Sequence, residues 1–173
     1  MLLLPDILAP GVSVVFCGIA VGECAALRGH HYSGRGDRFW NLLHEAGFTS
    51  ELLSPSDDVL LPEYGLGITD LVKGVAGSDS RGLDSSGRPE LESRLEPYSP
   101  AWVAFTGKAA GSEAARVFAQ PTPALGLQEW TVGKASVFVL PSSSSANQRK
   151  SYDGRPTRSA WWCELAERVA RTS

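Results

Sequence analysis

The sequence predicts an α/β protein with three layers, α/β/α, around a mainly parallel central sheet. Two observations predict this fold. Short apolar runs rich in β-branched residues recur along the chain and end at glycine or proline, as strands buried on both faces do. Segments with helical spacing alternate with these runs, which favours parallel strands joined by crossover helices. The length of 173 residues suits one domain, which we expect to span residues 1–173.

The first half of the chain contains two expected strands and one expected helix. Val12–Cys17 (VSVVFC) is an apolar run that ends at a glycine, and it predicts the first buried strand. Arg38–Ala46 predicts a helix, because four apolar residues recur at helical spacing before a glycine. Leu66–Ile68 predicts a short strand that leads directly into Thr69 and Asp70.

The second half begins with Gly74–Pro89, which is rich in Gly, Ser and Asp and predicts an exposed loop. Two further strands and three helices are then expected: strands at Ala101–Thr106 and Ser136–Leu140, and helices at Pro89–Tyr98, Lys108–Ala119 and Arg158–Arg171. In parallel sheets of this kind, ligands bind outside the carboxyl ends of the strands. Three segments would lie there: Gly18–Glu23, Thr69–Asp70 and Pro141–Asn147.

The composition limits the class of protein. Apolar residues make up 43% and charged residues 20%, which excludes a disordered chain. The longest apolar runs fall far short of the roughly 20 residues of a membrane span. Because the N-terminus also lacks the basic start of a signal peptide, we expect an intracellular, cytoplasmic protein with no membrane partner. Three cysteines without a CxxC pair, and a His30-His31 pair without further ligands at metal spacing, indicate no metal site and no cofactor.

The charge is unevenly distributed. The formal net charge is −3, which argues against a strongly basic nucleic-acid binder. Residues 1–107 contain 7 Lys and Arg against 14 Asp and Glu, whereas residues 108–173 contain 9 against 5. This asymmetry indicates a locally basic surface in the C-terminal third of an otherwise acidic chain.

The glycine-rich turn Gly18–Glu23 (GIAVGE) follows the first expected strand. It has neither the spacing of a dinucleotide fingerprint nor that of a phosphate-binding loop. The segment GHHY at Gly29–Tyr32 comes shortly after it. An aromatic side chain beside such a turn could provide a stacking platform for a planar ligand. The alternative is a turn that only connects a strand to a helix.

Several motifs together give the sequence a family resemblance. They cover most of the chain and are most specific in its first half: DILAPG (Asp6–Gly11), VVFCGI (Val14–Ile19), GHHY (Gly29–Tyr32), DRFW (Asp37–Trp40), EAGFT (Glu45–Thr49), GITDLV (Gly67–Val72), FTGK (Phe105–Lys108) and FVLPSSS (Phe138–Ser144). With these motifs the chain resembles the mismatch-specific uracil-DNA glycosylases, which are related to thymine-DNA glycosylases. The resemblance implies an enzyme that acts on double-stranded DNA containing uracil or mismatched bases. It would flip the uracil out of the duplex and hydrolyse its N-glycosidic bond.

The resemblance also implies roles for residues of the first motif region. Tyr32 would stack on the flipped base, and backbone groups of Ile19, Ala20 and Gly22 would line the base pocket together with Ser142. Uracil opposite guanine would be the substrate, with thymine and modified pyrimidines as further possibilities. We expect the enzyme to act as a monomer.

One position departs from the family pattern. The first family motif reads Gly-Ile-Asn-Pro-Gly and its Asn holds the attacking water, whereas Gly18–Gly22 reads GIAVG, so Ala20 cannot hold water by a side-chain hydrogen bond. Either the protein is slow or inactive, or another residue takes over. Asp70 is the first candidate, because a carboxylate at the end of a strand could activate water and stabilise the cationic sugar; its alternative is to cap a helix from Leu71. Glu23 is the second candidate, and its alternative is a first-turn helix acid.

The second family motif, Asn-Pro-Ser-Gly-Leu-Ser, corresponds here to SSSSAN at Ser142–Asn147. The residues that we expect to contact DNA lie in and just after it: Ser144, Ser145, Ala146, Asn147, Arg149 and Lys150. Ala146 is a small wedge where the family has leucine, so recognition of the opposite strand would be relaxed. Arg155 and Arg158 lie nearby and could also hold phosphates. The alternative is a flexible, solvated serine linker.

Two other functions stay open at this point. A catalytically inactive module that binds DNA lesions would keep Tyr32 and the phosphate-contacting loop. A small-molecule hydrolase would use a serine of Ser142–Ser145 as nucleophile, although the G-x-S-x-G motif that holds such a serine is absent. Neither motif segment contains a lysine that could form a Schiff base with the sugar. For a glycosylase we therefore expect simple hydrolysis, which makes the enzyme monofunctional.

Overall fold

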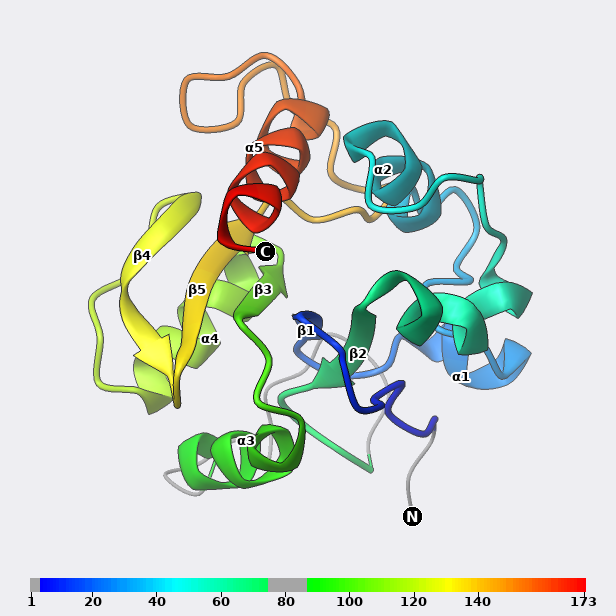
Figure 1. Cartoon of the computed structure of the whole chain (residues 1–173). Coiled ribbons are helices and arrows are strands. Elements are labelled where there is room, and N and C mark those ends of the chain that lie inside the picture. Colours follow the sequence, from blue (N-terminus) through cyan, green and yellow to red (C-terminus); the bar gives the residue numbers. More distant parts are fainter. Residues whose placement is uncertain (1–3, 75–86) are drawn as a thin grey trace.

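The computed structural model describes residues 4–74 and 87–173 and centres on one five-stranded sheet (Figure 1). The strand order is β2-β1-β3-β5-β4. The strand bounds are β1 (Val14–Gly18), β2 (Leu66–Asp70), β3 (Trp102–Thr106), β4 (Gly126–Val132) and β5 (Ala135–Leu140). β1 pairs in parallel with β2 and β3, β3 with β5, and only β4 is antiparallel. The expected α/β fold with a mainly parallel sheet is confirmed.

Helices cover both faces of this sheet, because alternate strand residues point to opposite sides. Val14 and Phe16 of β1 belong to a hydrophobic cluster with α2 (Phe39–Ala46) and α5 (Arg158–Thr172). Val15 and Cys17 belong to a second cluster with α3 (Gly87–Leu95) and α4 (Lys108–Val117). The strands are buried on both faces, as their continuous apolar runs predict.

Three elements lie where the sequence analysis placed none. The short helix α1 (Glu23–Arg28) begins after Gly22, which offers no side-chain cap. The 3-10 helix η1 (Pro55–Tyr64) contains Pro62 and has no apolar stripe of α-helical period. In the edge strand β4, exposed and less exposed residues alternate, because one of its faces is open to solvent. Elsewhere the expected positions agree with the structure to within a few residues, and the helix expected at Pro89–Tyr98 divides into α3 and the 3-10 helix η2 (Glu96–Tyr98). The loop expected at Gly74–Pro89 lies mostly outside the described residues, and its last three residues already belong to α3.

The parallel pairing brings the carboxyl ends of four strands to one edge of the sheet. Gly18, the last residue of β1, lies directly beside Asp70, the last residue of β2. Thr106 at the end of β3 lies beside Leu140 at the end of β5. The turns and loops that follow these strands therefore meet at this edge, where ligands bind in sheets of this kind.

Candidate active site

A cavity of about 920 Å³ opens at the carboxyl edge of the sheet. Its lining comes from five stretches of the chain: the turn and helix after β1, the segment around Tyr32, the end of β2, the turn into α4, and the loop after β5. All three segments that the sequence places at the crevice contribute to this lining. A cavity of this size holds a nucleoside and its surrounding water with room to spare.

Asp70 forms the buried end of the cavity. Its side chain is almost fully buried, with 4% of the residue exposed. The neighbouring Gly18 makes room for it, because a Cβ at position 18 would lie 3.0 Å from Asp70 Oδ1. Among the described residues no hydrogen-bond donor reaches Asp70 Oδ2, and the nearest cation is Lys73, whose Nζ lies 3.7 Å away. The alternative role as a helix cap is wrong, since no helix begins at Leu71.

Burial dominates the protonation of this carboxyl group. Loss of hydration raises the pKa of Asp70 above its ordinary value, while the Lys73 ammonium opposes that shift. A carboxylate with a raised pKa is a stronger base than a hydrated one. Its two oxygens differ in surroundings: Oδ1 lies toward Gly18 and the Tyr32 hydroxyl, whereas Oδ2 lies toward Lys73 and is shielded from water.

The Tyr32 ring shares the cavity with Asp70. It stacks on Phe39 with ring centroids 3.9 Å apart and planes 9° from parallel, so only its other face is free for a base. Its hydroxyl forms a 2.9 Å hydrogen bond with Thr106 Oγ1. A Cβ on Gly18 would lie 3.6 Å from this hydroxyl as well as 3.0 Å from Asp70, so the two groups lie on either side of one point. Burial raises the pKa of the Tyr32 phenol, which therefore stays neutral at physiological pH.

The glycine-rich turn runs along the cavity between these two groups. Ile19, Ala20 and Gly22 all line it, in agreement with the expected base pocket. The turn is tied to the segment after β2, because the Leu71 N–H donates to Gly18 O at 2.9 Å and the Val72 N–H to Ile19 O at 2.7 Å. The side chain of Ala20 has no polar atom, so no hydrogen bond to water can come from it.

Glu23, the second carboxylate candidate, lies at the exposed rim of the same cavity. It is the first residue of α1, and its side chain is solvated rather than buried. Its position fits the alternative of a first-turn acid as well as a role at the rim. Asp70 and Glu23 thus line one cavity, but only Asp70 is withdrawn from water.

These observations can be set beside known proteins. A family model described as the uracil DNA glycosylase superfamily matches residues 5–166. The chain belongs to the uracil DNA glycosylase superfamily. The solution NMR structure of a protein from Methanosarcina acetivorans, described as a candidate uracil DNA glycosylase, superposes with a TM-score of 0.60. The two share 19% sequence identity over 96% of each chain, a likeness that shows the fold.

Membership of the superfamily supports a glycosidase that acts on DNA and excises uracil. In the described ranges, 4–74 and 87–173, no helix is long and apolar enough to cross a membrane, and no cluster of three or more His, Cys, Asp or Glu side chains is placed to hold a metal ion.

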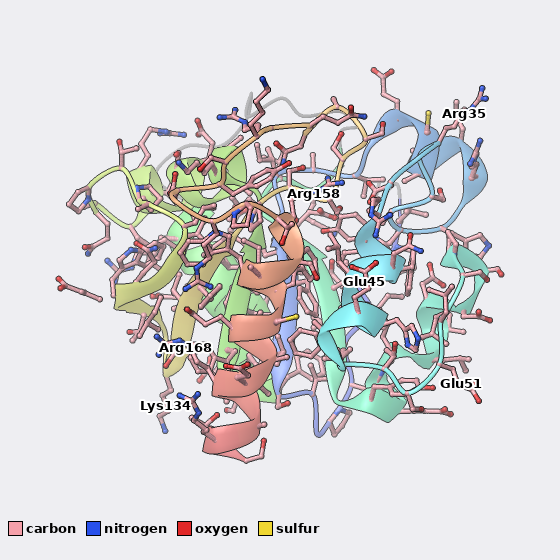
Figure 2. The ribbon with its side chains drawn as sticks, turned by 90° about the horizontal axis from the view of Figure 1, so that it is seen from above. Arg35, Glu45, Glu51, Lys134, Arg158 and Arg168 are labelled. Atoms are coloured by element: carbon pink, nitrogen blue, oxygen red, sulfur yellow. The ribbon has the colours of Figure 1, made fainter. Side chains whose placement is uncertain are left out.

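The loop after β5 forms the opposite wall of this glycosylase cavity. We call Ser142–Asp153 the serine loop. Asn147 Nδ2 and Arg158 Nη1 both donate to Ser142 O, at 2.9 and 3.0 Å, and Arg158 also donates to Ser144 O at 2.9 Å. Figure 2 shows Arg158 at the start of α5, close to this loop. These bonds connect the loop to itself and to α5, which argues against the alternative of a flexible linker.

The basic residues near the serine loop divide into two groups. Arg149 and Lys150 are exposed, and Arg149 lines the cavity. Arg158 holds the loop, and Arg155 lies 3.8 Å from the centroid of the Trp161 ring and pairs with Glu164. The expectation that Arg155 and Arg158 hold phosphates needs correction, because both guanidinium groups have internal partners that sequence alone does not show.

The remaining loop residues differ in access to the cavity. Ser142, Ser144, Ala146 and Asn147 line it, whereas Ser145 is exposed beside Gly36. The hydroxyls of Ser142 and Ser144 accept backbone N–H groups at 3.1 and 3.3 Å. In the described part of the chain neither hydroxyl bonds a histidine, so the serine-nucleophile reading has no general base to support it.

His31 is a structural residue rather than a free acid or base. Its Nε2 lies 2.8 Å from Pro5 O, and its backbone N–H donates to Asp58 Oδ2 at 3.2 Å. His30 lies 3.4 Å from the same carboxylate. These contacts give His31 a role in packing the segment before Tyr32 against the N-terminal residues.

Three polar residues of the site were not identified from sequence. Thr106 holds the Tyr32 hydroxyl from the end of β3. Asp37 lines the cavity and accepts the Phe39 N–H at 2.9 Å, and burial raises the pKa of its carboxyl group. Asp153 pairs with Lys108 and accepts the Leu125 N–H at 2.9 Å, which closes the far end of the serine loop. Thr106 and Asp37 lie in motifs of the family resemblance, which was the only signal for them.

Proposed function

We propose that this glycosylase is a monofunctional enzyme of the mismatch-specific type, which flips uracil out of double-stranded DNA and hydrolyses its N-glycosidic bond with Asp70 as the catalytic carboxylate. One observation carries the proposal: the buried Asp70 carboxylate and the Tyr32 ring line the same cavity. Uracil opposite guanine is the primary substrate.

The chemistry follows from these positions. The flipped uracil stacks on the free face of Tyr32, and backbone groups of Ile19 to Gly22 bind its polar edge. As the bond between C1′ and N1 breaks, its electron pair leaves with uracil and positive charge develops on the sugar. Asp70 stabilises that charge and orients a water molecule, whose oxygen bonds to C1′ and whose proton passes to the carboxylate. Asp70 thereby replaces the water-holding group that Ala20 lacks.

The serine loop provides the DNA contacts in this proposal. Ser144, Ser145 and Asn147 bind phosphate oxygens with Arg149 and Lys150, and Ala146 fills part of the space that the flipped base vacates. A methyl group fills that space poorly, so the enzyme tolerates varied bases opposite the lesion. This tolerance extends the substrate range toward thymine and modified pyrimidines. The enzyme acts as a monomer on chromosomal DNA inside the cell.

Hydrolysis rather than lyase chemistry follows from the amines near the cavity. Lys108 lines the cavity, but its Nζ lies 2.5 Å from Asp153 Oδ1, and an ion-paired ammonium is a poor nucleophile. Borohydride treatment during turnover should therefore trap no covalent complex with DNA.

The decisive experiment measures uracil release from a U·G duplex under single-turnover conditions. Asp70→Ala should lower the rate by about 10²–10⁴-fold, as removal of a positioned acid–base group does. Glu23→Gln, which removes the carboxylate at the exposed rim, should change it by less than about threefold if Asp70 is the acting base. An unchanged rate in Asp70→Ala would refute the assignment of Asp70.

The second candidate function is an inactive module that binds DNA lesions. The absence of a polar side chain at Ala20 is the observation that favours it. Tight binding of a U·G duplex by the wild-type protein without any uracil release at high enzyme concentration would establish it.

A further inference from the structure

A group of charged side chains lies behind Asp70, on the side away from the cavity. Lys73 Nζ is 3.7 Å from Asp70 Oδ2 but only 2.5 Å from Asp6 Oδ1. Arg94 on α3 donates to the backbone oxygen of Asp70 at 2.7 Å and to Thr69 Oγ1 at 3.0 Å. Lys73, Arg94 and Asp6 have side chains that are 17–19% exposed, so water screens their charges weakly.

Asp6 is itself held firmly. The next residue, Ile7, pairs with Ile68 of β2 through two backbone hydrogen bonds of 2.9 Å. Thr69 Oγ1 also donates to Asp6 Oδ1 at 3.0 Å. The Asp6 carboxylate therefore has a fixed position beside β2, and it fixes the Lys73 ammonium in turn.

This arrangement gives Asp70 a nearby positive charge without a hydrogen bond. Lys73 makes its short contact with Asp6. The positive charge of the ammonium therefore acts on Asp70 from 3.7 Å, while Asp70 Oδ2 accepts no hydrogen bond from a described residue. A direct lysine hydrogen bond would favour the charged form more strongly and would make the carboxylate a weaker base. In the described part of the chain, the other ionisable groups that face Asp70 are His31 and Tyr32 from the segment after α1 and Cys17 from β1.

We propose that Lys73 is a positioning residue that keeps Asp70 ionised, and that Asp6 is the tether that prevents Lys73 from forming a direct hydrogen bond with Asp70. The inference rests on the proposed role of Asp70 and deepens it. In the folded protein, burial and Asp6 raise the pKa of Asp70, whereas Lys73 and Arg94 lower it, with burial the largest influence and Lys73 the next. Removal of Lys73 and removal of Asp6 should therefore have opposite effects.

The test is the pH profile of single-turnover uracil release. Lys73→Met removes the positive charge, so the acid limb should move to higher pH, and rates measured well below the limb should fall about tenfold for each pKa unit of the shift. Asp6→Asn keeps the side-chain shape but frees Lys73 to reach Asp70. Its acid limb should move to lower pH, and its plateau rate should fall several-fold because a carboxylate that accepts a lysine hydrogen bond is a weaker base.

Matched variants separate this electrostatic role from a structural one. Lys73→Arg keeps the charge and should restore the wild-type acid limb. Lys134→Met and Glu129→Gln remove one positive and one negative charge from the exposed β4–β5 hairpin, and both should leave the pH profile unchanged. Figure 2 shows Lys134 far from Arg158. Shifts of the acid limb in the same direction for Lys73→Met and Asp6→Asn would overturn the inference. Removal of opposite charges should move the limb in opposite directions, whereas damage to the fold would not produce opposite shifts.

Direct titration of the Asp70 carboxyl group distinguishes a failure of the Lys73 inference from a failure of the proposed catalytic role of Asp70. The Asp70 carboxyl carbon, followed by NMR with Asp70→Asn as the assignment control, should titrate at higher pH in Lys73→Met than in the wild type. An unmoved titration overturns the role of Lys73, whatever the activity of that variant. Full activity of Asp70→Asn instead overturns the catalytic role of Asp70.

Discussion

The two walls of the cavity differ in burial and in the way they are held. One wall, which we call the strand wall, consists of the Gly18–Gly22 turn, Tyr32 and Asp70; strand ends and aromatic stacking position it. The other wall, the serine loop, is largely exposed and is held by side chains that bond its backbone oxygens. Reaction chemistry needs fixed, dehydrated groups, whereas DNA contacts need reach and solvated charge. The comparison indicates that catalysis belongs to the strand wall and DNA binding to the serine loop.

The largest effect outside Asp70 itself should follow from removing the ring of Tyr32. Base stacking on an aromatic side chain contributes about 1–3 kcal/mol, so Tyr32→Ala should lower kcat/KM for a U·G duplex roughly 10- to 100-fold. Tyr32→Phe keeps the ring and loses only the bond to Thr106, so it should recover most of that loss. Equal losses in both variants would show that the hydroxyl, and not the stacking surface, matters.

A smaller effect should follow from adding one methyl group to the strand wall. In Gly18→Ala the new Cβ would lie 3.0 Å from Asp70 Oδ1, so the carboxylate must move by a few tenths of an ångström. Misplacement of a catalytic group by about 1 Å costs up to about 10²-fold, and this smaller shift should cost about tenfold in the single-turnover rate.

Gly34→Ala is the matched control for Gly18→Ala. Its Cβ would make only an ordinary contact, 3.9 Å from Cys24. A rate in Gly18→Ala equal to that of this control would show that the approach of Gly18 to Asp70 has no functional importance.

The two walls also differ in how far the sequence predicts them. Val14–Gly18 and Leu66–Asp70 are buried on both faces, so their apolar residues identify strands and place Asp70 at the crevice. The contact between Asp6 and Lys73 joins residues 67 positions apart, and no local pattern encodes it. Arg158 bonds the backbone oxygen of Ser142, and Arg155 lies over the Trp161 ring. A count of positive charges in the sequence cannot reveal such partners.

The Asp70 carboxylate should also destabilise the folded protein at neutral pH. Because its pKa is raised on folding, the folded state binds the proton more tightly than the unfolded chain does. Stability therefore falls as pH rises from the unfolded pKa to the folded one, and the cost is fully present above both values. Asp70→Asn should raise the free energy of unfolding at pH 7.5 by about 1 kcal/mol, the lower end of the cost of an unpaired buried polar atom.

The gain in unfolding free energy from Asp70→Asn should shrink as the pH approaches 4, where the Asp70 carboxyl group is protonated to a growing extent in the folded and in the unfolded protein. Urea unfolding at the two pH values measures the difference. A variant that is less stable than the wild type at pH 7.5 would show that Lys73 and Arg94 compensate the buried charge completely.

The smallest effect should come from the exposed charges of the serine loop. Arg149 and Lys150 have solvated side chains on a protein of net charge −3, so DNA binding should release few counterions and depend weakly on salt. Arg149→Ala and Lys150→Ala should each weaken binding only a few-fold and reduce the slope of log Kd against log salt by less than about 1. Neither substitution should change the rate of bond cleavage at saturating enzyme, because the strand wall is intact.

A wild-type slope equivalent to about ten released ions would contradict this view, since it would require a much larger basic surface than the serine loop provides.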